Sequence, residues 1–95
     1  MVEKEVEIIN KYGLHARPAM ELVELANRYG SKIELCSGIL TVDAKSIMSV
    51  MRLAATRGTV LKLTADGQDA GEAIDALVKL VGRFDELGQD QASAG

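Results

Sequence analysis

Histidine, proline and cysteine each occur once in this 95-residue chain, and tryptophan does not occur at all. A single cysteine, Cys36, cannot form an internal disulfide, so we expect it to be an ordinary strand residue of a protein kept in a reducing compartment. No apolar run approaches the length of a signal-peptide core or a membrane span. These shortages predict a cytoplasmic protein that does not enter a membrane.

Positive charge and aromatic side chains are also scarce. Eleven Lys and Arg residues stand against fourteen Asp and Glu residues, which gives a net charge of −3, and aromatic residues make up 3% of the chain. Nucleic-acid binding depends on basic patches and often on stacking aromatics, so this composition disfavours it. With one histidine and one cysteine, the chain has no obvious cluster of metal ligands, and we expect no metal and no cofactor.

Hydrophobic residues, in contrast, make up 47% of the chain, which is enough for the core of one domain. Their spacing predicts strands and helices in alternation. The expected strands are 2–9, 32–36, 39–43 and 59–65, with a turn at Ser37-Gly38 between the second and third, and the expected helices are one ending at Tyr29-Gly30-Ser31, one at 47–55 and one at 70–84. Residues 1–88 form the predicted domain, and residues 89–95 lack periodicity and should be a flexible tail.

Residue types that favour helix starts precede the last two predicted helices. Ser46 is a good N-cap for the helix at 47–55, and Asp69 followed by Glu72 resembles a capping box. Four strands with alternating faces and three helices with one apolar stripe each pack most simply as an α+β open-faced sandwich, a single sheet covered on one side. From the pattern alone, a ferredoxin-like arrangement is equally compatible.

The only histidine, His15, lies in the run Gly13-Leu14-His15-Ala16-Arg17-Pro18-Ala19, at the start of the first predicted helix. Pro18 suits the first helical turn because the N–H that it lacks would be unpaired there. A phosphoryl group on the imidazole would meet free backbone donors, the positive end of the helix dipole and the guanidinium of Arg17. His15 is therefore a candidate phosphoryl acceptor, although a lone histidine before a helix is more often a surface residue or a weak cap.

The helix at 47–55 carries apolar residues around its whole axis: Ile47, Met48, Val50, Met51, Leu53 and Ala54. A sheet can cover only one side of such a helix, so some of these side chains should remain exposed and form a contact surface. The alternative is that all of them belong to the core. Methionine suits a contact surface because its flexible side chain fits several partners.

Two separated motifs make the chain resemble the HPr family, the histidine-containing phosphocarriers of the bacterial phosphoenolpyruvate-dependent phosphotransferase system. The first is the run from Gly13 to Ala19, and the second is Lys45-Ser46-Ile47-Met48-Ser49-Val50-Met51, which is similar to the segment around the regulatory serine of that family. The resemblance extends from about Val2 to about Leu87. It implies an open-faced sandwich with an antiparallel sheet.

The resemblance also implies a function. His15 would accept a phosphoryl group on Nδ1 from enzyme I and pass it to IIA domains, so the protein would be a carrier and not an enzyme. Arg17 would hold the phosphate, and Ser46 would be the target of a regulatory kinase, the HPr kinase/phosphorylase, with a transcriptional regulator as a further partner. Val50 and Leu53 would be core residues. Met20, Ile47, Met48 and Met51 would bind partners, and the protein would be a monomer.

Two other functions remain open at this point. One is a signalling module that acts mainly through phosphorylated Ser46, and the presence of His15 argues against that as the sole role. The other is a small-ligand-binding α+β domain, which would leave both motifs unexplained.

Overall fold

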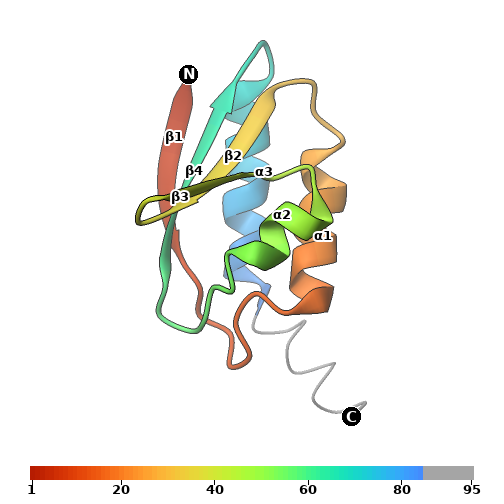
Figure 1. Ribbon diagram of the computed structural model, residues 1–95. Helices are drawn as coiled ribbons and strands as arrows, with labels where there is room; N and C mark the ends of the chain where they lie inside the picture. The colour runs from red at the N-terminus through yellow and green to blue at the C-terminus, as the bar shows by residue number, and fades with distance from the viewer. Residues whose placement is uncertain (85–95) are drawn as a thin grey trace.

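The computed structural model describes residues 1–84, and the predicted tail at 89–95 lies outside them. One four-stranded sheet is packed against three helices (Figure 1). The elements are β1 (Val2–Glu7), α1 (Ala16–Ala26), β2 (Lys32–Ser37), β3 (Leu40–Asp43), α2 (Ile47–Arg52), β4 (Val60–Asp66) and α3 (Ala70–Gly82). The predicted order of strands and helices is therefore confirmed.

The sheet has the strand order β1-β4-β2-β3, and every neighbouring pair is antiparallel. The first strand therefore lies beside the last, with Val2 opposite Ala65 and Glu7 opposite Val60. This pairing brings the segment that follows β1 close to the segment that precedes β4. Those two segments carry the candidate site.

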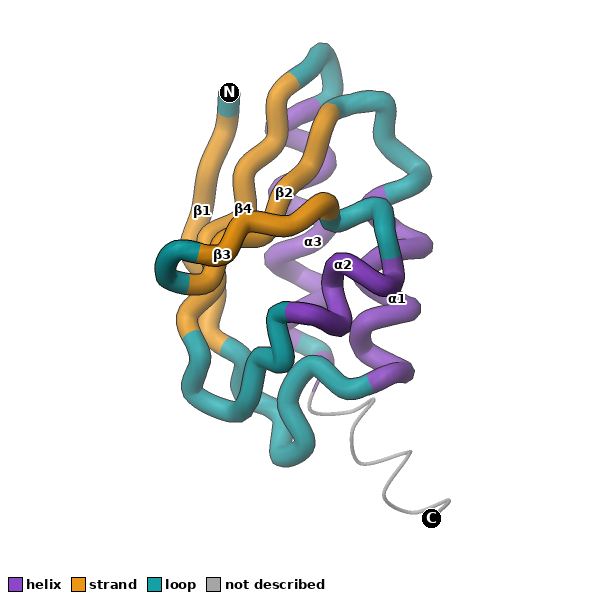
Figure 2. Tube along the Cα trace, viewed as in Figure 1, coloured by secondary structure: helices purple, strands orange, loops and turns teal. Residues whose placement is uncertain are grey.

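All three helices lie on one face of the sheet, as the open-faced sandwich requires (Figure 2). The side chains between the layers are aliphatic, apart from Phe84, because strands and helices both direct their apolar positions inward. The largest fully buried hydrophobic side chains are Ile8, Leu22, Ile33, Leu35, Val50, Leu61, Leu63, Ile74, Leu77, Val81 and Phe84. Within residues 1–84, no helix is long and apolar enough to cross a lipid bilayer.

Several boundaries differ from the prediction: β1 ends at Glu7 and not at residue 9, and α1 ends at Ala26 and not at Tyr29-Gly30-Ser31. Two further differences change the local structure. The turn between β2 and β3 is formed by Gly38 and Ile39, not by Ser37 and Gly38, which leaves Ile39 fully exposed at its tip. Helix α2 ends at Arg52, not at Ala55, because Ala54 has a φ of +48° and a residue in this left-handed region cannot continue an α-helix. Ala55 therefore lies outside the helix, and its carbonyl makes a contact described below.

The predicted capping box at the start of α3 is wrong. Asp69 is the N-cap residue, but its carboxylate accepts no hydrogen bond from its own helix. It accepts hydrogen bonds from the backbone N–H of Gly30 at 2.9 Å and of Ser31 at 3.0 Å, and a third from the Ser31 hydroxyl. These bonds connect the start of α3 to the loop between α1 and β2.

Hydrogen bonding to the Ser31 hydroxyl, and then to the Gly30 amide, lowers the pKa of Asp69 below its ordinary value of 3.8. The carboxylate therefore stabilises the fold fully above that value, and the stabilisation is lost as the pH falls through the lower folded-state pKa. We predict that Asp69→Asn lowers the melting temperature by several degrees at pH 7, and that the difference from wild type shrinks towards pH 2. Thermal unfolding followed by circular dichroism measures both. Asp75→Asn, at an exposed carboxylate on α3, is the control and should change little.

Candidate functional site

His15 is the N-cap residue of α1, with extended backbone angles (φ −80°, ψ −173°). Its carbonyl accepts the first helical hydrogen bond, from the Ala19 N–H at 3.0 Å, but its side chain does not cap the helix. Pro18 is in the first turn and has no N–H, whereas Ala16 and Arg17 have amides that α-helical geometry leaves without an intrahelical acceptor. The helix start therefore presents free backbone donors beside His15, as the sequence predicts.

The imidazole ring of His15 is half-buried and has no hydrogen bond to the described residues. Its Nε2 atom is buried without a partner. The ring of Tyr12 meets it edge to face, with ring centroids 5.9 Å apart and planes at 90°, a geometry favoured for aromatic pairs. Packing and backbone geometry, not polar contacts, therefore set the orientation of the ring.

The segment that carries His15 is attached to the segment before β4. At its base, Ile8 donates from its N–H to the carbonyl of Thr59 at 2.9 Å and accepts from the N–H of Gly58 at 2.7 Å. Next to His15, the Leu14 N–H donates to the carbonyl of Ala55 at 2.8 Å, and the Leu14 side chain is buried in the core. His15 is thus held by contacts between parts of the chain that are far apart in sequence.

Gly13 is the residue at which the two segments approach most closely. Its φ is +66°, and a Cβ at this position would clash with the carbonyl oxygen of Ala55 and lie 2.9 Å from Thr56 Cα. Only glycine fits this combination of backbone angle and space. Asn10 is fully buried beside it and donates from Nδ2 to the Gly13 carbonyl at 2.6 Å.

Arg17 is in the first turn of α1 and is exposed. Among the described residues, it makes no ion pair with a carboxylate. Its guanidinium can therefore contact an anion bound at the start of α1 without first breaking an internal interaction.

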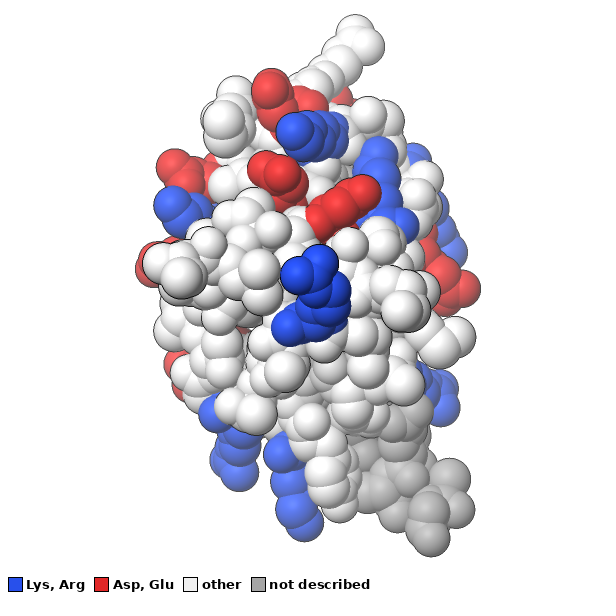
Figure 3. Space-filling view, viewed as in Figure 1, with Lys and Arg blue, Asp and Glu red and all other residues white. Residues whose placement is uncertain are grey.

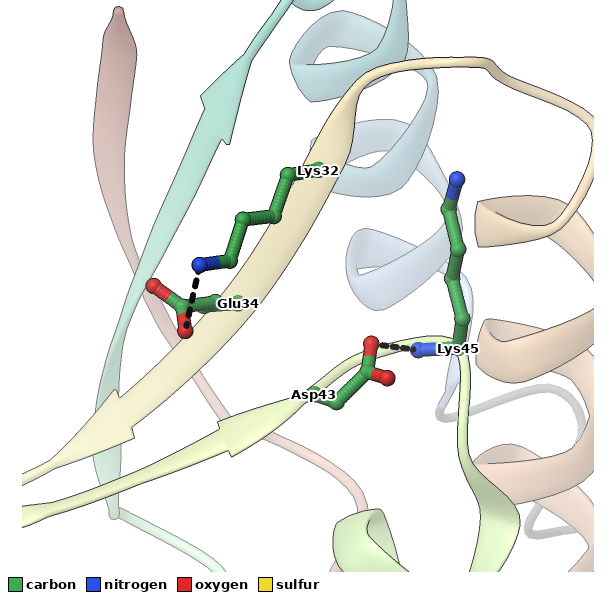
Figure 4. A network of polar contacts seen from close by, with 4 residues as sticks. All are labelled: Lys32, Glu34, Asp43 and Lys45. Carbon is green, nitrogen blue, oxygen red and sulfur yellow. Dashed lines mark hydrogen bonds and ion pairs between the residues drawn. The ribbon is translucent and has the colours of Figure 1, made fainter.

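Ser46 is the N-cap of α2, as the sequence predicts, and its hydroxyl oxygen accepts a hydrogen bond from the Ser49 N–H at 3.3 Å. The preceding turn is fixed on both sides. Asp43 accepts from the Lys45 N–H at 2.9 Å, while the Lys45 side chain extends away from Asp43 (Figure 4) and donates to the carbonyl of Tyr29 at 2.7 Å. The figure also shows the ion pair of Lys32 with Glu34 on the uncovered face of the sheet, 3.9 Å long.

Four apolar side chains on the packed pair α1 and α2 remain exposed, which we call the apolar patch. They are Met20 at 53%, Ile47 at 37%, Met48 at 74% and Met51 at 41% exposure. Val50 and Leu53 point into the core, as expected. The alternative in which every apolar residue of this helix is buried is therefore wrong.

Sequence reasoning did not single out Asn10 or Tyr12. The Asn-x-x-Gly spacing of residues 10–13 is typical of a turn and could have indicated the Asn10 contact. The contact of Tyr12 with His15 depends on the path of the loop, which local sequence does not specify.

Comparison with known proteins gives consistent results. The family model described as "PTS HPr component phosphorylation site" matches residues 2–83. The chain is 46% identical to the phosphocarrier protein HPr of Cupriavidus necator, over 90% of this chain and 98% of the relative. It is 49% identical to the HPr of Pseudomonas aeruginosa, over 86% and 93% of the two chains.

Solved structures agree with the sequence relatives. The crystal structure of HPr-C-His from Thermoanaerobacter tengcongensis matches with a TM-score of 0.87 and 45% identity, over 90% of this chain and 97% of that chain. Another similar structure, of Crh from Bacillus subtilis, is described as a swapped dimer (TM-score 0.71, 43% identity, 87% and 95% coverage), so the expected monomer stays a prediction. The matches cover nearly all the described residues, and the chain belongs to the HPr family of phosphocarrier proteins.

Proposed function

We propose that His15 accepts a phosphoryl group on Nδ1 from phosphorylated enzyme I and transfers it to IIA domains in the cytoplasm. The observation that carries this proposal is the position of His15 at the N-cap of α1, beside the free amides of the first turn. Burial of Nε2 supports Nδ1 as the reacting atom, because it leaves Nδ1 as the more accessible ring nitrogen.

The transfer needs no cofactor. The Nδ1 lone pair attacks phosphorus, an N–P bond forms, and the bond to the donor breaks with its electron pair staying on the donor. The reverse sequence on a IIA domain regenerates free His15. An uncharged imidazole nitrogen attacks with its own lone pair, so no separate base has to remove a proton from the nucleophile.

A carrier must hold the phosphate without retaining it. The helix dipole contributes about 0.3–1 kcal/mol at an exposed helix start, and Arg17 adds a charged donor that is itself exposed. Interactions of this size stabilise the phosphorylated state moderately, which suits reversible transfer.

Charge on the proposed docking face supports an acidic partner surface. Residues 8–20 and 44–59 contain no Asp or Glu, although the whole chain has a net charge of −3. Lys11, Arg17, Arg52 and Arg57 are exposed in these segments. In Figure 3 the acidic atoms concentrate in the upper half of the view, whereas the area around and below α2 is mostly uncharged or basic. The apolar patch, with basic residues around it, would dock enzyme I and IIA.

Phosphorylation of Ser46 is the proposed regulation. A phosphate there would add about 1.5–2 negative charges at the start of α2, where free backbone donors tolerate it. The same charge would lie next to Ile47 and Met48 in the apolar patch, so it would weaken docking without unfolding the helix. The alternative role, signalling mainly through phosphorylated Ser46, would use the same residue and leave His15 without a task.

Removing His15 tests the carrier function. We predict that wild type incubated with phosphoenolpyruvate and enzyme I gains one acid-labile, base-stable phosphate, because a phosphoramidate hydrolyses in acid. His15→Ala should gain none, while Ser46→Ala should gain it normally. The measurement is intact-protein mass spectrometry before and after acid treatment. Acid-labile phosphate on His15→Ala would refute the assignment.

Removing the charge of Arg17 tests phosphate contact. A charge-assisted hydrogen bond contributes about 1.5–3 kcal/mol, so Arg17→Ala should slow phosphorylation about 10- to 100-fold. Because Arg17 is exposed, the melting temperature should stay near wild type. Rapid-quench kinetics gives the rate, and Arg28→Ala, at an exposed arginine beyond the end of α1, is the matched control. A normal rate for Arg17→Ala would make this arginine a solvated residue without a role.

Docking is tested by one charged and one apolar change. We predict that Ser46→Asp and Met48→Ala both raise the KM of enzyme I for this protein, with melting temperatures near wild type because Asp is itself a good N-cap. The Ser46→Asp defect should shrink at high salt, where charge repulsion is screened, and the Met48→Ala defect should not.

Matched controls lie on the uncovered face of the sheet. Thr41→Asp adds a charge at an exposed strand position, and Val60→Ala truncates an apolar side chain that is 52% exposed. Steady-state titrations at two salt concentrations should give wild-type KM values for both controls. Equal KM changes at the control and test positions would show that α2 is not the docking surface.

A further inference from the structure

The peptide group between Gly13 and Leu14 is hydrogen-bonded at both ends. Its carbonyl accepts from Nδ2 of Asn10 at 2.6 Å, and its N–H donates to the carbonyl of Ala55 at 2.8 Å. We propose that Asn10 is a positioning residue for phosphotransfer, which fixes this peptide plane and thereby the direction in which His15 is presented. The inference rests on the proposed function of His15 and deepens it.

The orientation of the His15 ring depends on its backbone and on packing against Tyr12. The ring has no hydrogen bond to the described residues, so no polar partner corrects its position if the chain before it moves. The plane of the Gly13–Leu14 peptide is one residue away. Rotation of this plane would tilt the Leu14–His15 segment and displace the imidazole.

Asn10 supplies the side-chain contact in this part of the loop. The Gly13 N–H also donates back to the Asn10 carbonyl at 3.1 Å, so Asn10 and Gly13 form a closed turn with two hydrogen bonds. Gly13 has a positive φ and is pressed against Ala55, a conformation that the turn must maintain. Ala55 holds the N–H side of the peptide, and Asn10 holds the carbonyl side.

The second polar atom of Asn10 indicates that the residue does not serve stability alone. Its Oδ1 is buried with no hydrogen-bond partner among the described residues, and the residue is 0% exposed. A buried amide oxygen without a partner destabilises the folded state, and an apolar side chain of similar shape would avoid that cost. Asparagine at this position therefore fits a need for its N–H donor towards Gly13.

Misplacement of a reacting group by about 1 Å costs on the order of 100-fold in rate. We expect Asn10→Leu, which keeps the approximate shape and removes the donor, to lower the kcat of phosphorylation by enzyme I at least tenfold. The KM should stay unchanged, because the apolar patch is on α1 and α2. Asn10→Ala should behave likewise.

A substitution in the core, away from His15, distinguishes a loss of fold stability from a displacement of the His15 ring. Ile33→Val truncates a fully buried residue that pairs with Ala65 near the start of β1, at the end of the sheet away from His15. We expect it to lower the melting temperature as much as or more than Asn10→Leu, with wild-type kcat. A fall in kcat that tracks melting temperature across all three variants would overturn the proposal.

Nuclear magnetic resonance of the unphosphorylated protein gives a readout that needs no transfer. Side-chain couplings of His15 should report one χ1 rotamer in wild type and in Ile33→Val, and averaged rotamers in both Asn10 variants. Wild-type couplings and kcat in either folded Asn10 variant would refute the positioning role, and so would a raised KM with normal kcat. Loss of the fold in both variants would make Asn10 a requirement of folding and refute it as well. If wild type itself accepts no phosphate, the proposed function fails, whereas the couplings still decide the role of Asn10.

Discussion

The backbone hydrogen bond from Leu14 to Ala55 connects the segment before α1 to the segment after α2. Leu14 is buried and directly precedes His15, and Ala55 follows α2 by a few residues. One contact thereby links the segment that carries the histidine to the segment that ends the helix of the apolar patch. The left-handed conformation of Ala54 and the close approach of Gly13 to Ala55 are found on either side of this contact.

His15 and Ser46 are both N-cap residues, but their side chains treat the free amides of the first helical turn differently. Ser46 accepts a hydrogen bond from its own helix and is therefore an ordinary cap, whereas the side chain of His15 leaves the amides of α1 free. A cap that satisfies the helix stabilises it, and a cap that does not leaves room for an external anion. The start of α2 is therefore closed by its own cap, whereas the start of α1 keeps free backbone donors beside His15.

Local sequence predicts local structure well here. The apolar stripe of α3, the Ser46 cap and the free start of α1 depend on residues within one or two turns, and all are found. The capping box predicted at Asp69 is wrong because its carboxylate accepts hydrogen bonds from Gly30 and Ser31, which are distant in sequence, and not from its own helix. The pattern predicted an open-faced sandwich, but strand order depends on long-range pairing, so a ferredoxin-like arrangement stayed equally compatible. The resemblance to HPr indicated the antiparallel sheet that is observed. The contacts of Asn10 and Tyr12 depend on the path of the loop before α1, which no periodic pattern describes.

Because β1 pairs with β4, the loop that carries His15 can be held in place only after a late part of the chain has been synthesised. The histidine leaves the ribosome early, but Ala55, Gly58 and Thr59, which hold its loop, are made some 40 residues later. Contacts of such high sequence separation form late in folding because closing the intervening loop is entropically costly. A nascent or truncated chain therefore contains His15 without the segment that holds its loop, and the geometry around His15 forms only when most of the domain is complete.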